Sequence, residues 1–262
     1  MRGWAVHALT IAVVAGSVLP SSAQLRDAAP GSADLRAIHA RVVYGMVDVR
    51  GEERQGSGWL LAQSGRPLVI TNRHVVLAED APCPDRLRGL GEFEIRFYAG
   101  SSAPPATISA RVAYCSRSID LAILRLQADP PTSARPLRMR VDTDVARGER
   151  VVLGGNPGGN LPFQTTEGVV TGRTTRGNDV CGANRNCVVI DAASLAGCSG
   201  GPVFNRAGQL VGMVWGGELG EIRTGSGTLR PNAVGVTGTS LSFLIHTRTI
   251  AGELQSLERD RR

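Results

Sequence analysis

Short runs of β-forming residues follow one another along most of this chain, and their close spacing constrains its fold more than any other feature. Eleven such runs lie between residues 41 and 215, with turn-forming residues between them and no long helical pattern of the kind that parallel α/β units require. Glycine, at 33 of 262 residues, supplies the tight turns that many short strands need. The pattern predicts an all-β barrel or sandwich. The runs are Arg41–Val49, Gly58–Ala62, Leu68–Thr71, Glu94–Tyr98, Ser109–Tyr114, Leu121–Leu126, Arg150–Leu153, Gly168–Thr171, Val188–Asp191, Pro202–Asn205 and Gln209–Trp215.

A proline-containing stretch, Ala128–Arg138, divides this part of the chain into halves of similar length. Near the end of the chain, Thr239 and Ser240 are suitable N-caps for a helix whose apolar positions Leu241 and Leu254 lie on one face. We expect a lead segment at 24–40, with a helical turn or two from residue 34, followed by a domain at 41–255. The domain is expected to have lobes at about 41–130 and 131–240 and a helix at about 241–254. A tail at 255–262 ends the chain.

The first 23 residues have the composition of a secretory signal. Arg2 supplies the positive start, Trp4–Leu19 is mostly apolar, and small residues precede a cleavage point after Ala23. The apolar stretch is shorter than the roughly 20 residues of a membrane span. We therefore expect a cleaved signal rather than a retained anchor, and an exported protein that is periplasmic or secreted.

Five cysteines follow the signal, and disulfides are expected in an exported protein. Cys181 and Cys187 enclose a short turn-rich loop, which makes them the first expected pair. Cys83 with Cys115 is the second, and Cys198 is left over. A zinc site is the weaker alternative, because there is no Cys-x-x-Cys and histidine is scarce. We expect no metal and no organic cofactor.

Two ionisable residues lie next to or inside apolar runs. His74 follows Leu68–Arg73 and precedes two valines, so the ring is expected at the exit of a buried strand, fixed and still accessible to a substrate. His39 and His246 are interpreted as surface or packing residues. Asp120 lies in an apolar run, where an unpaired carboxylate is costly to bury, and an imidazole N–H would be a natural partner. The alternative is an aspartate that caps a turn.

Ser199 lies in a glycine-rich turn, Gly197–Pro202. Backbone N–H groups in such a turn are able to converge on one oxygen and stabilise an oxyanion. The alternative is an ordinary glycine-rich hairpin turn. The neighbouring Gly154–Gly159 is not a phosphate loop, because it lacks the Gly-Lys-Ser/Thr ending and the chain has no lysine.

Taken in order, these motifs resemble the chymotrypsin-fold (trypsin-like) serine endopeptidases, and within them the bacterial HtrA/Deg-type branch. The resemblance covers roughly residues 40–255, and the order His, Asp, Ser along the chain is that of the family. The matching segments are Gly56–Leu61, Thr71–Val76, Asp120–Leu124, Gly155–Gly159, Thr165–Val170, Asp191–Ala193 and Gly197–Pro202.

The resemblance implies two six-stranded antiparallel β-barrels with a C-terminal helix, and an active site in the cleft between the barrels. His74 and Asp120 come from the first barrel and Ser199 from the second. Ser199 would attack the scissile carbonyl, His74 would transfer the proton, and Asp120 would orient the imidazole. The backbone N–H groups of Gly197 and Ser199 would form the oxyanion hole.

The chain departs from the family in two respects. Cys198 stands before the serine where digestive members carry an aspartate that binds the new N-terminus, so we expect activity without that ion pair. The branch usually carries C-terminal PDZ modules, and the 63 residues after Ser199 are too few for one. Cys198 is not the expected nucleophile, because Ser199 holds the position directly before the two glycines.

The resemblance also locates a substrate pocket with Ala193 at its base and Val214, Trp215 and Gly216 in its walls. No aspartate stands at the base to attract Arg or Lys, so we expect cleavage after apolar residues. A catalytically silent binding protein on the same scaffold is the main alternative function, and hydrolysis of small esters is a further one.

The net charge of +6 rests on 29 basic residues, all of them arginine. The densest groups, Arg135–Arg140 and Arg259–Arg262, are short, and no aromatic residues are interleaved with them. We therefore interpret the charge as scattered over the surface and expect protein or peptide substrates, no nucleic acid and no stable membrane span after signal cleavage. The oligomeric state is left open.

Overall fold

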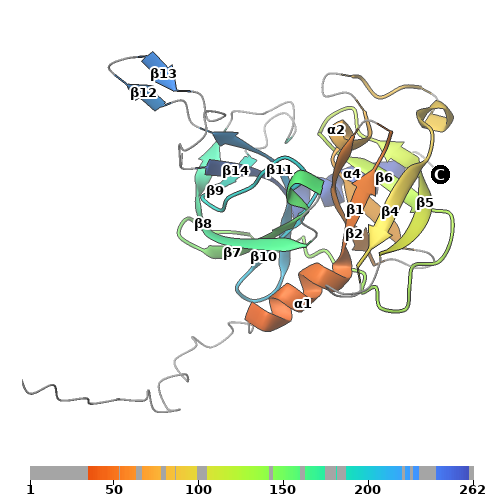
Figure 1. Ribbon diagram of the computed structural model, residues 1–262, viewed down its shortest axis with the longest axis horizontal. Helices are drawn as coiled ribbons and strands as arrows, with labels where there is room; N and C mark the ends of the chain where they lie inside the picture. Colours follow the sequence, from red (N-terminus) through yellow and green to blue (C-terminus); the bar gives the residue numbers. More distant parts are fainter. Residues whose placement is uncertain are drawn as a thin grey trace, which may run out of the picture. The chain divides into compact units, whose positions relative to one another are not determined.

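The short strands form two closed six-stranded antiparallel β-barrels in the computed structural model of the protein (Figure 1). This confirms the expected fold of two barrels with a C-terminal helix. The structure describes residues 35–52, 54–62, 67–77, 81–85, 87–98, 105–141, 144–159, 163–174, 181, 187–219, 222–224, 227–229 and 240–259. The expected signal at 1–23 lies outside these residues.

The first barrel has the strand order β1-β2-β3-β6-β5-β4. A four-residue helix, α2 (Arg73–Val76), follows β3, and a short 3-10 helix, η1 (Leu87–Leu90), precedes β4. The strands are β1 (Met46–Arg50), β2 (Gln55–Leu61), β3 (Leu68–Thr71), β4 (Phe93–Phe97), β5 (Ala106–Cys115) and β6 (Ala122–Leu126).

The second barrel has the strand order β10-β11-β14-β9-β8-β7, and a separate two-stranded sheet pairs β12 with β13. The 3-10 helix η2 (Pro157–Gly159) follows β7. The strands are β7 (Arg150–Gly155), β8 (Gln164–Thr174), β9 (Cys187–Ile190), β10 (Pro202–Asn205), β11 (Leu210–Leu219), β12 (Ile222–Thr224), β13 (Gly227–Leu229) and β14 (Ser240–His246).

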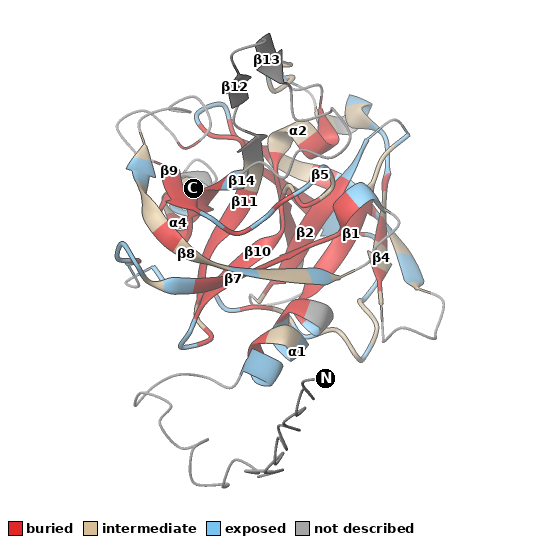
Figure 2. Cartoon of the chain, turned by 60° about the vertical axis from the view of Figure 1, so that its left-hand side comes forward, coloured by how far each residue is buried: buried red, intermediate tan, exposed pale blue. Residues whose placement is uncertain are grey.

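Many strands carry buried residues at consecutive positions (Figure 2). Since successive side chains point to opposite sides of a strand, both faces of these strands are buried. Along β2, Leu60 belongs to the core of the first barrel. Its neighbour Trp59, fully buried, belongs to a second cluster that also includes Phe204 and Met213 of the second barrel. This shared apolar cluster joins the two barrels and fixes the strand ends that carry the candidate site.

The chain enters the first barrel through α1 (Leu35–Gly45), which replaces the first part of the strand expected at Arg41–Val49. The reason is tertiary packing. Ile38 and Val42 are four residues apart, so they lie on one helix face, and both are completely buried in the cluster that joins the barrels.

The C-terminal helix begins later than its sequence pattern suggests. The residues from Ser240 to His246 form β14, which pairs with β9 and β11, and α4 extends over Thr247–Arg259. The helix expected at 241–254 therefore begins at Thr247 instead, because the segment Ser240–His246 is needed as a strand to close the second barrel. None of the helices in the described part of the chain is long and apolar enough to cross a membrane.

Candidate active site

His74 is positioned by the end of β3 and the first turn of α2. Val75 and Val76 bury their side chains in the core of the first barrel, while His74 stays partly exposed. The amide of Asn72, at the helix start, donates a hydrogen bond of 2.9 Å to the backbone carbonyl of Asp120. The strand exit therefore holds the histidine and the segment before β6 together.

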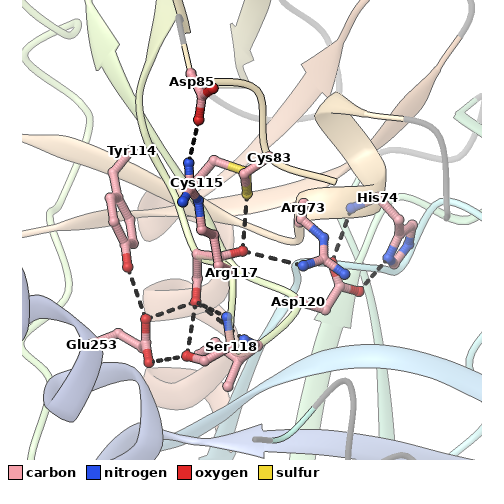
Figure 3. Close-up of a disulfide and its surroundings, with 12 residues drawn as sticks. Arg73, His74, Cys83, Asp85, Tyr114, Cys115, Arg117, Ser118, Asp120 and Glu253 are labelled. Carbon is pink, nitrogen blue, oxygen red and sulfur yellow. Dashed lines mark hydrogen bonds and ion pairs between the residues drawn. A yellow bond between two sulfur atoms is a disulfide. The ribbon is translucent and has the colours of Figure 1, made fainter. Parts of the chain in front are cut away.

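His74 and Asp120 form a close pair (Figure 3). The distance from His74 Nδ1 to Asp120 Oδ2 is 2.6 Å, and the backbone N–H of His74 donates to Oδ1 at 2.9 Å. Asp120 is 4% exposed. An ionised carboxylate only accepts hydrogen bonds, so Nδ1 carries the proton. In the neutral ring, Nε2 is then the basic nitrogen that is left to accept a proton.

The loop before Asp120 is fastened to the C-terminal helix by one carboxylate (Figure 3). Glu253 of α4 accepts hydrogen bonds from the hydroxyl groups of Tyr114 at 2.8 Å, Ser116 at 2.7 Å, and Ser118. The Ser116 hydroxyl also accepts the backbone N–H of Ile119 at 3.1 Å. The sequence alone does not indicate this role for Glu253, since the residue lies on an amphipathic helix more than a hundred residues from its partners.

Both expected disulfides are present in the structure. Cys83–Cys115 connects the segment after α2 to the end of β5, and so to the loop that leads to Asp120. Arg73 adds a hydrogen bond of 3.2 Å to the carbonyl of Ser116. The histidine and aspartate segments are thus linked covalently as well as by hydrogen bonds.

Ser199 occupies a tight turn that only glycine allows on either side. Gly197 and Gly200 have φ angles of 97° and 89°, in the region that L side chains rarely adopt. A Cβ at Gly200 would lie 2.0 Å from the carbonyl oxygen of Ser57, and one at Gly197 would lie 2.3 Å from that of Asn156. The turn is therefore pressed against backbone from both barrels.

Two peptide groups of this turn are oriented by bonds to their carbonyls. The carbonyl of Ala196 accepts the N–H of Gly158 at 2.7 Å, and that of Cys198 accepts an N–H three residues on at 2.9 Å. In a planar trans peptide the N–H points opposite to the C=O. The N–H groups of Gly197 and Ser199 therefore point away from the two N–H donors bound to these carbonyls, and neither donates a hydrogen bond within the described residues.

Ser57 of β2 connects this turn to both barrels, and it is completely buried. Its hydroxyl donates to the carbonyl of Gly197 at 2.7 Å and accepts the backbone N–H of Asn156 at 2.9 Å. Its own N–H donates to the carbonyl of Ser199 at 2.8 Å, and its carbonyl accepts the Thr71 hydroxyl at 2.7 Å. In the sequence Ser57 is only part of a matching motif, because nothing local reveals these partners.

The Ser199 hydroxyl is turned toward β11. It donates a hydrogen bond of 3.0 Å to the carbonyl of Trp215, and within the described residues no hydrogen bond joins it to His74. The structure thus brings His74 to Asp120 and Ser199 to Trp215.

Cys198 is the free cysteine of the described chain, and it is buried. Burial raises the pKa of its thiol, the chief effect, while a hydrogen bond to Leu195 acts in the opposite direction. Its sulfur fills the space that a side chain at Gly155 would need. A buried thiol with a raised pKa is a poor nucleophile, so Cys198 acts as a packing residue.

The four residues expected to line the substrate pocket lie in different surroundings. Val214 is completely buried in the core of the second barrel, and Trp215 packs against Phe243 with ring centroids 5.7 Å apart. Gly216 is half-buried, with open space where a side chain would be. Ala193 is exposed, and its carbonyl accepts the Thr166 hydroxyl at 2.8 Å.

Comparison with known proteins gives one family. The sequence profile of the trypsin-like peptidase domain matches residues 56–213. The serine protease Do-like HtrA of Bacillus subtilis is 29% identical over 167 residues, which is 62% of this chain and 33% of that protein. The probable periplasmic serine endoprotease DegP-like of Brucella suis is 32% identical over 62% of this chain and 28% of that protein. The chain thus spans a third or less of the length of these relatives.

Solved structures show the same fold. The inactive form of the Ser343Ala mutant of Rv3671c from M. tuberculosis aligns with a TM-score of 0.59 and 22% identity, over 86% of this chain and 92% of that one. The HtrA-type protease AlgW, solved with a tripeptide, aligns with a TM-score of 0.62 and 19% identity, over 86% and 64% of the two chains.

The two disulfides should contribute unequally to stability, because cross-linking a longer loop removes more entropy from the unfolded chain. The partners are 32 residues apart in Cys83–Cys115 and 6 apart in Cys181–Cys187. We expect the Cys83→Ala/Cys115→Ala variant to lose about 3–4 kcal/mol of unfolding free energy, and the Cys181→Ala/Cys187→Ala variant about 2–3 kcal/mol. Urea unfolding of both variants measures this, and a larger loss for the second pair would contradict it.

Proposed function

The chain belongs to the trypsin-like peptidase family, and from this membership we propose that it is a serine endopeptidase in which Ser199 is the nucleophile. His74 is the general base and Asp120 its orienting partner. The observation that carries the proposal is the His74–Asp120 pair, with Nδ1 and Oδ2 2.6 Å apart. That bond holds the tautomer in which Nε2 is basic and directed away from the carboxylate.

The reaction follows from these roles. Ser199 Oγ bonds to the scissile carbonyl carbon while its proton passes to His74 Nε2. The tetrahedral intermediate collapses, the C–N bond breaks, and the leaving amine takes the proton from His74. Water then attacks the acyl-enzyme ester, giving a proton to His74, which returns it to Ser199 as the acid departs. Asp120 stays ionised and stabilises the imidazolium in both halves.

The negative charge on the substrate oxygen is stabilised by the N–H groups of Gly197 and Ser199. Two features of the turn support this role. Both peptide groups are fixed by bonds to their carbonyls, so their N–H groups need no reorganisation when charge develops. The Ser57 hydroxyl fixes the carbonyl of Gly197, the next peptide along the turn.

The bond from Ser199 to the Trp215 carbonyl adds one step before attack. The hydroxyl leaves that carbonyl and rotates to donate to His74. A hydrogen bond of this kind contributes about 1 kcal/mol net, so the rotation is a small barrier beside that of peptide hydrolysis. In enzymes without bound substrate, such catalytic hydrogen bonds are often not yet formed.

We further infer that the protein acts outside the cytoplasm, on protein or peptide substrates. The signal-like composition of residues 1–23 supports export, as do the two disulfides, which persist in oxidising compartments. The names of relatives such as the Brucella suis protein, a probable periplasmic serine endoprotease, agree with this.

Labelling with a fluorophosphonate, read by intact mass, tests the catalytic proposal. We expect one adduct on the protein and none on Ser199→Ala, because only a serine activated by a base reacts rapidly. Cys198→Ala is the matched control at the adjacent buried position and should keep the adduct. The same spectrum shows whether the exported protein starts at Gln24. Absence of an adduct on correctly folded protein would favour a silent binding protein.

Replacement of Ser57 tests the oxyanion hole. One oxyanion donor is worth about 10²–10³ in rate, so a turn that loses its Ser57 anchor should label at least about tenfold more slowly. We therefore expect Ser57→Ala to lower the labelling rate while the protein still folds. Thr247→Ala, which removes another buried hydroxyl bond, from Thr247 to the Arg140 carbonyl at 2.9 Å, should leave the rate unchanged. Equal rates in both variants would assign Ser57 a structural role only.

The substrate preference is tested by cleavage of a peptide library. We expect cleavage after apolar residues, because no acidic side chain stands at Ala193. In the Ala193→Asp variant the profile should shift toward Arg and Lys, since a carboxylate would then lie at the base of the pocket. A profile of the unaltered protein dominated by Arg or Lys would overturn the assignment.

A further inference from the structure

A cavity of about 590 Å³ opens beside α1, between the connection that joins the barrels and the turn from β10 to β11. Four arginines line it: Arg41, Arg135, Arg138 and Arg140. None of the described residues in its lining is acidic. In Figures 1 and 2, α1 lies at the end of the molecule opposite to α2, the helix that carries His74. The cavity is therefore separate from the candidate active site.

The connection between the barrels presents its arginines to solvent because it is extended and anchored twice. Leu137 forms a parallel bridge with Leu61 of the first barrel, and Met139 forms one with Leu210 of the second. Leu137 is buried, while Arg138 is exposed. Since successive residues of an extended chain point to opposite sides, the same pairing that packs Leu137 and Met139 turns Arg138 and Arg140 outward.

Arg41 reaches this cavity from α1, almost a hundred residues earlier in the chain. Its guanidinium donates to the carbonyl of Gly208 in the β10–β11 turn. Arg135 is fixed in a similar way. Its backbone N–H donates to the carbonyl of Tyr44 at 2.7 Å, and its guanidinium Nη1 donates to the carbonyl of Thr132 at 2.6 Å. The cationic groups are thus held in place by neutral acceptors.

Five other arginines of the chain are instead paired with acidic side chains. Those at positions 50, 96, 111, 117 and 173 each pair with a carboxylate. Within the described residues, Arg41, Arg135 and Arg138 form no such ion pair. A carbonyl satisfies an N–H donor and leaves the positive charge uncompensated. The cavity therefore gathers four arginines with no acidic residue among the described residues of its lining.

We propose that this cavity binds a small polyanion, a ligand with two or more phosphate or carboxylate groups. The planar guanidinium fork matches both groups, with two parallel N–H···O bonds each. The volume lies within the roughly 300–1,000 Å³ of small-molecule sites. The proposal does not depend on the catalytic function of Ser199, because it rests on different residues at another face.

Calorimetric titration of the purified protein with two probes tests this. Inorganic tripolyphosphate supplies phosphate groups and citrate supplies carboxylates. The probe that binds with the higher affinity identifies which of the two anionic groups the cavity prefers. We expect binding at low ionic strength that weakens as salt is added, because the Debye length falls from about 30 Å at 0.01 M to about 10 Å at 0.1 M.

Charge-matched variants separate this site from diffuse attraction. In Arg135→Gln/Arg138→Gln we expect at least about tenfold weaker binding, since each lost guanidinium removes a charge-assisted bond pair. Arg125→Gln/Arg150→Gln removes two exposed arginines from other strands and should bind as the unaltered protein does. Arg138→Gln alone serves if the first variant does not fold, and it should bind severalfold more weakly. Equal losses in the two double variants, or no binding of either probe, would overturn the proposal.

Discussion

The candidate active site depends on the hydrogen bonds of the Ser57 hydroxyl. It is buried, and its partners come from the second barrel although it belongs to a strand of the first. A buried hydroxyl is costly unless it is paired, so its partners are held at fixed positions. They are the carbonyl of Gly197 and the N–H of Asn156. These hydrogen bonds thus fix the position of one barrel relative to the other at the turn that carries Ser199.

Independent contacts within the first barrel also hold the candidate site in place. The His74–Asp120 pair lies at the adjacent ends of β3 and β6. The Cys83–Cys115 disulfide and the carboxylate of Glu253 hold the loop that leads to Asp120. The apolar cluster shared by the barrels supplies the cohesion, and the polar contacts set the geometry. This division of roles is expected, because burial of apolar area is non-directional and hydrogen bonds are directional.

Charged side chains have different hydrogen-bond partners on the two faces of the molecule. Near His74, Asp120 is enclosed and satisfied by N–H donors. Beside α1, Arg41 and Arg135 are held by backbone carbonyls that leave their charge exposed to a ligand. The fold adds Arg41 to the group of arginines that the sequence already places close together at Arg135–Arg140.

The sequence by itself determined an all-β fold, because turn residues and strand spacing are local signals. The motifs around His74, Asp120 and Ser199 indicated the family, and the two-barrel architecture followed from that resemblance. The sequence did not determine the start of α4, since β14 is needed to close the second barrel. Nor did it show the contacts of Ser57 and Glu253 or the entry of Arg41 into the basic cavity. These join residues far apart in the chain, so only tertiary packing decides them. The rotamer of Ser199 was settled in the same way, by the carbonyl of Trp215 that the fold brings beside it.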